Sequence, residues 1–187
     1  MNYICHSGGC AGSDMMWENE GMKYGVKTVA YSFYNHVQDS QNQKILSLKE
    51  LEEGYENVLI ADKTLKRYPN RIMYPYVKNL LSRNWFQVKN SEAIFAIGMF
   101  ANKKRTLVKG GTGWAVQMAI DNKKVVYLFD QDSKFWYQYN YTTGAFERLY
   151  EMPKLTKNFA GIGTRKLNED GINAIKEIYK ENFNSED

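Results

Sequence analysis

Residues 107–120 read LVKGGTGWAVQMAI, in which three glycines stand just before an apolar stretch. Glycine lets the backbone approach a ligand closely, and a helix that follows turns its free N–H groups and the positive end of its dipole toward the same point. The stretch therefore predicts an anion-binding turn that opens a helix. Because the apolar run AIFAIGMF precedes it at residues 93–100, the turn is expected to follow a β-strand.

Apolar runs that favour β-structure alternate with helical patterns on both sides of this turn. The expected strands are residues 3–6, 28–33, 93–99, 125–130 and 158–161. The expected helices are residues 13–24, 74–89, 113–122 and 168–182. This alternation predicts an α/β fold, a Rossmann-like three-layer sandwich with a mostly parallel sheet. The runs AIFAIGMF and KVVYLFD are apolar on both faces, as central strands covered by helices should be.

Two stretches interrupt the alternation. Residues 34–68 are polar and predict a loop or a partial helix over one end of the sheet. Residues 131–157 contain two alternating runs around Thr142, Thr143 and Gly144, which predict a β-hairpin. With 187 residues and no linker, the chain is expected to form a single domain, 1–187, that holds both inserts.

The composition is that of a soluble globular protein, with 43% hydrophobic residues, 25% charged residues and a net charge of +4. The basic residues are spread along the chain, whereas extended nucleic acid usually requires a clustered basic stripe. A small anionic ligand is therefore favoured, and single-stranded nucleic acid is not expected. The sequence has no apolar run long enough to span a bilayer and no signal peptide, which predicts a cytoplasmic protein without a membrane partner.

The numbers of cysteine, histidine and aromatic residues indicate which cofactors and partners to expect. Cys5 and Cys10 are five residues apart across an expected strand and turn, which favours reduced thiols over a disulfide. With two cysteines and two histidines, neither a structural metal nor another cofactor is expected. Aromatic residues reach 14%, and so many amphipathic rings favour a flat ligand, a homo-oligomer interface, or both.

Three glycine turns follow expected strands: HSGGCAGSD at 6–14, KGGTG at 109–113 and FAGIGTR at 159–165. In a parallel sheet such turns gather at the carboxyl edge of the strands, where ligands bind. Each turn taken alone is compatible with a plain connection. Three on one edge, carrying hydroxyl groups and Arg165, favour a phosphate or nucleotide site.

The segments SGGCAGSD, RNWFQVKNSEAIFAIG, GGTGWAVQ and FAGIGTR resemble the Rossmann-like superfamily that groups the DNA-processing protein DprA with the LOG phosphoribohydrolases (SLOG). Members bind nucleotides, nucleotide-derived signals or single-stranded DNA, and LOG enzymes release a free base from a nucleoside monophosphate. The resemblance covers the strand–turn–helix segments and neither insert. The FAGIGTR unit normally precedes the SGG…GSD turn in these proteins, so the resemblance implies a circular permutation.

The resemblance also implies roles for particular residues. LOG enzymes carry an arginine in a helix followed by a GGxGTxxE motif, and Arg83 matches that arginine by spacing. Gly110, Gly111 and Gly113 match the glycines of the motif, as the GGTGWAVQ segment shows. Trp114 stands at the threonine position and is equally compatible with stacking on a base and with packing against a subunit. Gln117 stands at the position of the glutamate.

The residue type at Gln117 distinguishes between a protein that binds a nucleotide and one that cleaves it. Breaking an N-glycosidic bond develops positive charge on the sugar, which a carboxylate stabilises. Glutamine has the shape of glutamate without its charge, and is suited to hydrogen-bonding a ribose hydroxyl or a base edge. The expectation is therefore a protein without catalytic residues. Asp14 and Glu18 are the acids that an enzyme would use instead, although capping a helix and facing solvent are ordinary roles for them.

The function expected from the sequence is to bind and retain a nucleotide-derived small molecule, as a sensor or as a sponge for a signalling nucleotide. A sponge would suit a phage anti-defence protein in the host cytoplasm. The alternative is a nucleoside-phosphate N-glycosidase that resembles the phosphoribohydrolases. The residues expected to bind the ligand are Ser7, Gly8, Gly9, Gly12, Ser13, Asp14, Arg83, Asn84, Gly110, Gly111, Thr112, Gly113, Trp114, Gln117, Gly161, Gly163, Thr164 and Arg165.

Overall fold

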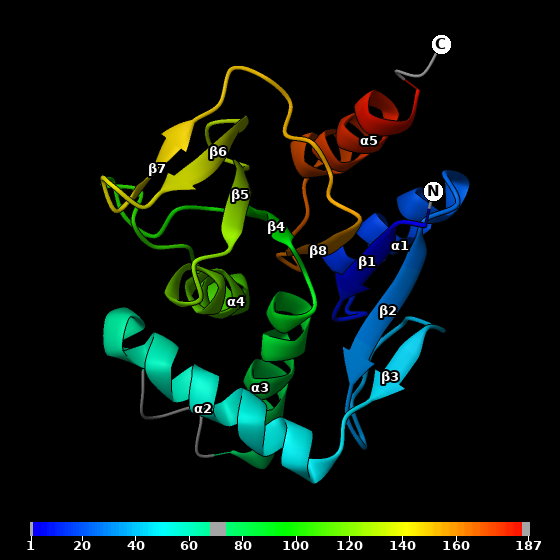
Figure 1. Ribbon diagram of the computed structural model, residues 1–187, viewed down its shortest axis with the longest axis vertical. Coiled ribbons are helices and arrows are strands. Elements are labelled where there is room, and N and C mark those ends of the chain that lie inside the picture. The colour runs from blue at the N-terminus through cyan, green and yellow to red at the C-terminus, as the bar shows by residue number, and fades with distance from the viewer. Residues whose placement is uncertain (1, 68–73, 185–187) are drawn as a thin grey trace.

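The protein is built around a twisted, mostly parallel β-sheet (Figure 1). The computed structural model describes residues 2–67 and 74–184, and within them the sheet has eight strands in the order β3-β2-β1-β8-β4-β5-β6-β7. The strands are β1 (Ile4–Ser7), β2 (Lys27–Ser32), β3 (Gln43–Ile45), β4 (Ala93–Gly98), β5 (Val125–Asp130), β6 (Phe135–Asn140), β7 (Ala145–Arg148) and β8 (Asn158–Gly163). The pairings from β3 to β5 are parallel, whereas β6 and β7 run antiparallel to their neighbours. The α/β fold class expected from the sequence is confirmed.

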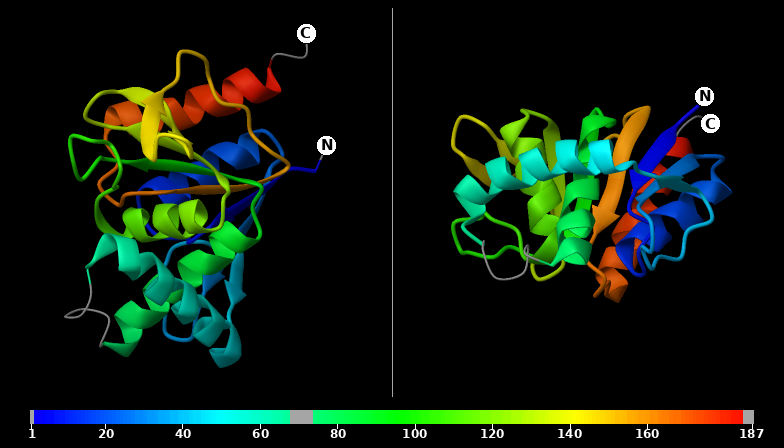
Figure 2. Two further views of the ribbon diagram at one scale, coloured as in Figure 1. Left: turned by 60° about the vertical axis from the view of Figure 1, so that its left-hand side comes forward. Right: turned by 90° about the horizontal axis from the view of Figure 1, so that it is seen from below.

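Helices cover both faces of the sheet, which makes three layers (Figure 2). The helices are α1 (Ser13–Lys23), α2 (Leu48–Leu65), α3 (Pro75–Lys89), α4 (Gly110–Asp121) and α5 (Glu169–Phe183). Helices α1 and α5 pack on one face, and α3 and α4 pack on the other with α2 laid across them. Helix α4 begins at Gly110, three residues earlier than the sequence pattern indicates, so the glycines form its first turn.

The position of β4 between two layers of helices explains why its sequence is apolar throughout. Ala93, Phe95 and Ile97 belong to the core cluster under α1 and α5. Ile94 and Ala96 belong to the cluster under α2, α3 and α4. Since successive side chains of a strand point to opposite faces, a strand covered by helices on both sides needs apolar residues throughout.

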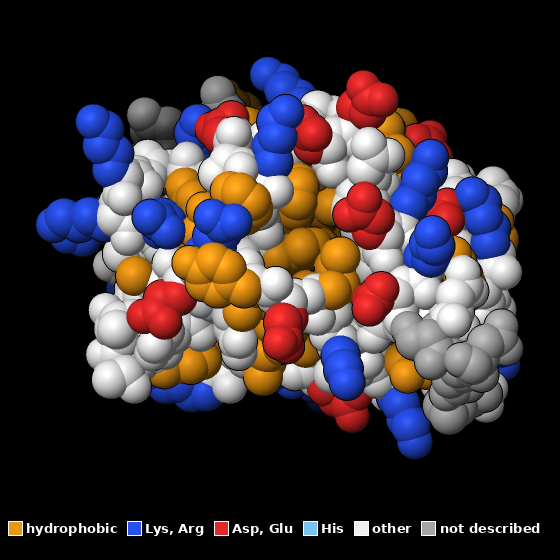
Figure 3. Space-filling model, turned by 90° about the horizontal axis from the view of Figure 1, so that it is seen from above, with side chains coloured by type: hydrophobic (Ala, Val, Ile, Leu, Met, Phe, Trp, Pro, Cys, Tyr) orange, Lys and Arg blue, Asp and Glu red, His pale blue; other side chains and the backbone are white. Residues whose placement is uncertain are grey.

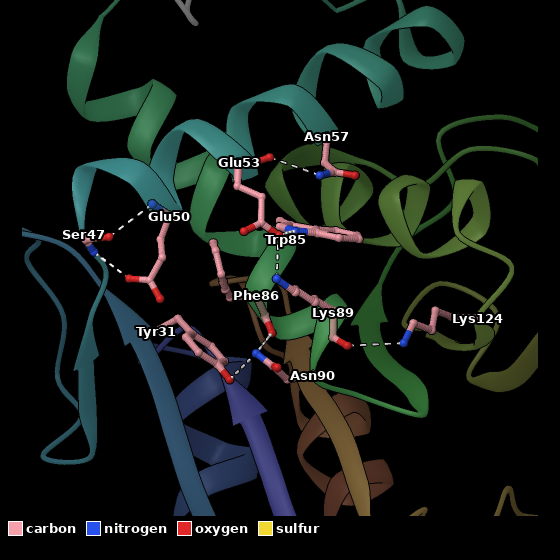
Figure 4. Close-up of polar contacts among 10 residues, drawn as sticks. All are labelled: Tyr31, Ser47, Glu50, Glu53, Asn57, Trp85, Phe86, Lys89, Asn90 and Lys124. Carbon is pink, nitrogen blue, oxygen red and sulfur yellow. Dashed lines mark hydrogen bonds and ion pairs between the residues drawn. The ribbon is translucent and has the colours of Figure 1, made fainter.

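The polar insert at 34–68 contains more regular structure than expected, namely the edge strand β3 and the 18-residue helix α2. A capping box starts α2: Ser47 Oγ accepts from the backbone N–H of Glu50 at 3.2 Å, and the Glu50 carboxylate accepts from the backbone N–H of Ser47 at 2.8 Å (Figure 4). Helix α2 passes close to α3 at Gly54, where a Cβ would meet the backbone of Ser82. Residue 68 lies outside the described residues.

Polar contacts tie α2 and α3 together on their outer side. Glu53 accepts hydrogen bonds from Trp85 Nε1 at 2.9 Å and from Lys89 Nζ at 2.7 Å (Figure 4). At the end of α3, Asn90 Nδ2 donates to the hydroxyl of Tyr31 in β2 at 2.7 Å. These contacts fix α3 between the outer helix and the sheet.

The expected β-hairpin is confirmed as β6 and β7, which extend the sheet beyond β5. Gly144 in its turn has a φ of 70°, a conformation that favours glycine. On the face that carries α5 and the hairpin, apolar side chains lie in the middle with charged side chains around them (Figure 3). In the described part of the chain, the helices are too short or too polar to cross a membrane.

Candidate functional site

The three glycine turns surround one cavity of about 760 Å³ at the carboxyl edge of β1, β4 and β8. Helix α3 supplies a further wall. Four cationic side chains and one carboxyl group line the cavity: Arg83, Lys109, Arg165, Lys166 and Asp14. The apolar lining consists of Val77, Leu80, Leu81, Met99, Ala115 and Ile162. A cavity of this size with mostly positive charge and one apolar wall suits an anion that carries a flat apolar group.

The first and third turns are held against each other, although they lie far apart in the sequence. Both the backbone N–H and the hydroxyl of Ser13 donate to the carbonyl of Thr164, at 3.1 and 2.7 Å. Gly12 has a φ of 90°, and a Cβ there would lie 2.6 Å from the backbone oxygen of Arg165. The absence of a side chain at Gly12 therefore lets the Arg165 turn close over the start of α1.

Arg83 reaches the cavity from α3 and is 6% exposed. Its Nη2 donates to Cys10 Sγ at 3.2 Å, and its Nη1 donates to the side-chain oxygen of Gln87 at 2.9 Å. The same oxygen of Gln87 accepts from the backbone N–H of Gly8 at 3.0 Å. A Cβ at Gly8 would overlap the guanidinium group of Arg83. Gly8 is thus required for the placement of the arginine.

Asp14 is buried in the first turn of α1 and lines the cavity. Burial raises the pKa of its carboxyl group to about 6, against the opposing effect of Arg83 and, more weakly, of Arg165. The backbone N–H of Cys10 donates to Asp14 Oδ2 at 3.3 Å. The group therefore titrates near neutral pH while it faces the cavity.

The second glycine turn opens α4 with its N–H groups beside the cavity. Gly110 and Gly111 line the cavity, and a Cβ at either position would have nothing within 4 Å. Arg67, at the end of α2, donates to the carbonyls of Val108 at 2.7 Å and Gly110 at 3.2 Å. The outer helix thus holds the shape of this turn, and the space above it is open to a ligand.

The structure does not bring every expected ligand residue to the cavity. Trp114 is 6% exposed and packs in the core cluster beneath α4. Gln117 is 5% exposed and donates to Asp121 Oδ1 at 2.8 Å. Helix α4 starts at Gly110, and neither Trp114 nor Gln117 is among the residues that line the cavity. The glutamate position of the LOG motif therefore does not face the cavity.

Some other expected residues support the cavity or lie away from it. Glu18 is buried on α1 and accepts from Ser40 Oγ at 2.9 Å, which fastens the loop between β2 and β3 to that helix. Gly161 packs against Cys5 and Trp17 in the core. The expected residues that line the cavity are Asp14, Arg83, Asn84, Gly110, Gly111, Thr112, Gly163, Thr164 and Arg165. Those that support its turns or backbone without lining it are Ser7, Gly8, Gly9, Gly12, Ser13 and Gly113.

Sequence reasoning missed several residues of the site. Gln87 lies four residues after Arg83 and so on the same face of α3, a spacing that would have indicated it. Lys109 is the first residue of the second glycine turn, and Lys166 directly follows the third. Arg67 gives no sequence signal, because its contact with the second turn depends on how α2 crosses the molecule.

Cys10 lies at the floor of the cavity between two arginines. Its Sγ accepts from Arg83 Nη2 at 3.2 Å and from Arg165 Nη2 at 3.6 Å, and lies 3.8 Å from Nε2 of His36. Burial and the two guanidinium groups lower the pKa of His36 to about 4, so its imidazole is neutral at neutral pH. Both cysteines are reduced, as the sequence predicts.

Comparison of the chain with protein-family models, with curated proteins and with solved structures gives no match. Among the described residues, no group of three or more His, Cys, Asp or Glu side chains is placed to hold a metal ion. The function is therefore argued from the cavity itself.

Proposed function

We propose that the protein binds a nucleotide-derived anionic small molecule in the cavity at the carboxyl edge of the sheet and retains it unchanged. The observation that carries the proposal is that three glycine turns, the buried Arg83 and the exposed Arg165 meet around one cavity of about 760 Å³. Phosphate oxygens are expected at the N–H groups of Gly111 and Thr112 and at the guanidinium groups.

The apolar wall of the cavity suits the base of such a ligand. Val77, Leu80 and Leu81 come from α3 and line the same cavity as the charged turns. An aliphatic wall can cover the flat face of a purine or pyrimidine, while the cations of the cavity hold its phosphates. A chain that retains such a molecule acts as a sensor or as a sponge. The proposed function thus keeps the nucleotide binding that the resemblance to the SLOG superfamily implies and leaves out the cleavage that LOG enzymes perform.

Native mass spectrometry tests the proposal. The purified protein is exposed to a bacterial nucleotide extract and to a panel of nucleoside phosphates and dinucleotides, and the retained mass is recorded. Arg165→Ala is expected to weaken retention by roughly ten- to a hundredfold, because a charge-assisted hydrogen bond to an anion contributes about 1.5–3 kcal/mol. Lys176→Ala is the control, since it removes one positive charge from an exposed position on α5. If no nucleotide is retained at micromolar protein, the proposal is wrong.

One observation favours a second candidate, a nucleoside-phosphate N-glycosidase. Asp14 lines the cavity with a pKa raised to about 6, which suits a general acid at neutral pH. Incubation with nucleoside monophosphates followed by chromatography separates the two functions. If the wild-type chain releases free base and Asp14→Asn does not, the protein is a hydrolase and the proposal of retention is wrong. Intact nucleotide recovered from the complex would support retention.

A further inference from the structure

Cys10 is the only described thiol that lines the cavity, and its sulfur is in contact with two guanidinium groups. Two guanidinium groups donate to its Sγ, from Arg83 at 3.2 Å and from Arg165 at 3.6 Å. A thiolate is the reactive form of cysteine, and neighbouring cations stabilise it. Cys5 is a contrast within the same chain, because it is 0% exposed and burial raises the pKa of its thiol well above the usual range.

A second observation shows that this corner of the cavity has unused donor capacity. Nε of Arg83 is buried and has no hydrogen-bond partner among the described residues, although the whole side chain is 6% exposed. Buried polar groups are normally paired, so an unpaired guanidinium N–H beside a cavity indicates an acceptor that is supplied from outside the fold. An oxygen atom attached to Cys10 Sγ would lie among these donors.

We propose that Cys10 is an oxidation site, at which a hydroperoxide converts the thiol to a sulfenic acid held by Arg83 and Arg165. The sulfur attacks one peroxide oxygen, an S–O bond forms and the O–O bond breaks. The leaving group is hydroxide when the oxidant is hydrogen peroxide and alkoxide when it is an organic hydroperoxide. It takes the proton that the thiol gives up and becomes water or an alcohol. Sulfur is oxidised by two electrons and the peroxide is reduced by two. The two guanidinium groups, which contact the sulfur, are placed to stabilise the negative charge that develops on the leaving oxygen.

Oxidation at this position has a consequence for the ligand, and this part rests on the proposed function. A sulfenate would occupy the same guanidinium groups that are proposed to hold a phosphate. Oxidised protein is therefore expected to retain less nucleotide than reduced protein, and a thiol reductant is expected to restore retention. The oxidation itself is independent of any nucleotide.

The test is to treat the folded protein with hydrogen peroxide in the presence of dimedone, which traps sulfenic acids, and to map the adduct by peptide mass spectrometry. The adduct is expected on Cys10 and not on Cys5, and to be absent from Cys10→Ser. Arg165→Gln is expected to slow adduct formation roughly tenfold through loss of one cation. Arg148→Gln, which changes an arginine on the hairpin, is expected to leave the rate unchanged.

Three outcomes would overturn the proposal: no adduct on Cys10 in the folded protein, equal labelling of Cys5 and Cys10, or a rate that Arg165→Gln does not change. Urea-unfolded protein serves as the positive control, since both thiols are then accessible. Because dimedone labelling needs no nucleotide, loss of nucleotide retention alone would leave the labelling result intact. Failure of the oxidation site is thus distinguished from failure of the proposed function.

Discussion

Asp14 is buried beside two arginines, and yet its carboxyl group holds a proton more tightly than an exposed aspartate does. Burial raises its pKa from 3.8 to about 6, so between these values the folded chain binds a proton that the unfolded chain has released. The contribution of Asp14 to stability is therefore most favourable below about pH 4 and declines as the pH rises to about 6.

Asp14→Asn is expected to remove this dependence. Relative to the variant, the wild-type chain should lose up to about 3 kcal/mol of unfolding free energy between pH 4 and pH 6 and change little above that range. Urea unfolding of both chains at several pH values measures the difference. A difference that stays constant across this pH range would mean that Asp14 is not titrating there.

At the residue scale, the sequence identified the charged part of the site better than the part expected to contact sugar or base. Arg165 and Asp14 were found because glycine turns after parallel strands meet at one edge of the sheet, and Arg83 was found by its spacing in the resemblance to the LOG enzymes. Trp114 and Gln117 were expected at the ligand because their spacing was counted from a motif. Their direction depends on the residue at which α4 begins. With α4 starting at Gly110, Trp114 packs in the core and Gln117 is hydrogen-bonded to Asp121.

At the scale of single elements, α2 shows why a polar insert was underestimated. Its buried positions are Leu51, Gly54, Val58, Ala61 and Leu65. They alternate in steps of three and four, which is the spacing of a helix that buries one stripe. Two of the five are small, however, so the stripe contributes little to a hydrophobic pattern. The close approach of α2 to α3 requires glycine at Gly54, and a glycine at a buried position makes the helix harder to recognise from its sequence.

Gly54→Ala tests whether this crossing positions the site. A Cβ at Gly54 would lie 2.7 Å from the carbonyl carbon of Ser82, the residue before Arg83. We expect the unfolding free energy to fall by about 1–3 kcal/mol through overpacking, and nucleotide retention to weaken as α3 moves. Urea unfolding and native mass spectrometry measure the two effects. Glu56→Ala, at an exposed position of the same helix, should change the unfolding free energy by less than about 0.5 kcal/mol.

For the whole molecule, β8 is the strand that unites the sheet. It pairs with β1 on one side and with β4 on the other, so it joins β3-β2-β1 to β4-β5-β6-β7. The sequence predicted this strand and its glycine turn but not its central place, because strand order depends on pairing between distant segments. Its turn brings Arg165 to the cavity, so the same element completes both the core and the site.

Hydrogen exchange is expected to reveal this central role. Amides of β8 should exchange only through global unfolding, because the strand is covered by helices and bonded on both edges. Amides of the edge strand β7 should exchange faster. Mass spectrometry of peptides from the two strands provides the comparison, and similar exchange rates in β7 and β8 would contradict the assignment of β8 as the centre of the fold.

The position of β8 late in the chain also matters during synthesis. A ribosome releases both half-sheets before the strand that joins them has been made, so the nascent chain exposes the unpaired edges of β1 and β4 at the same time. Such edges can pair with strands of other chains. Aggregation is therefore most expected in this interval, and a chaperone that binds then would prevent it. Arg165, which follows β8, is made directly after that strand, so the newly made protein completes its sheet and the lining of its cavity at the same late stage.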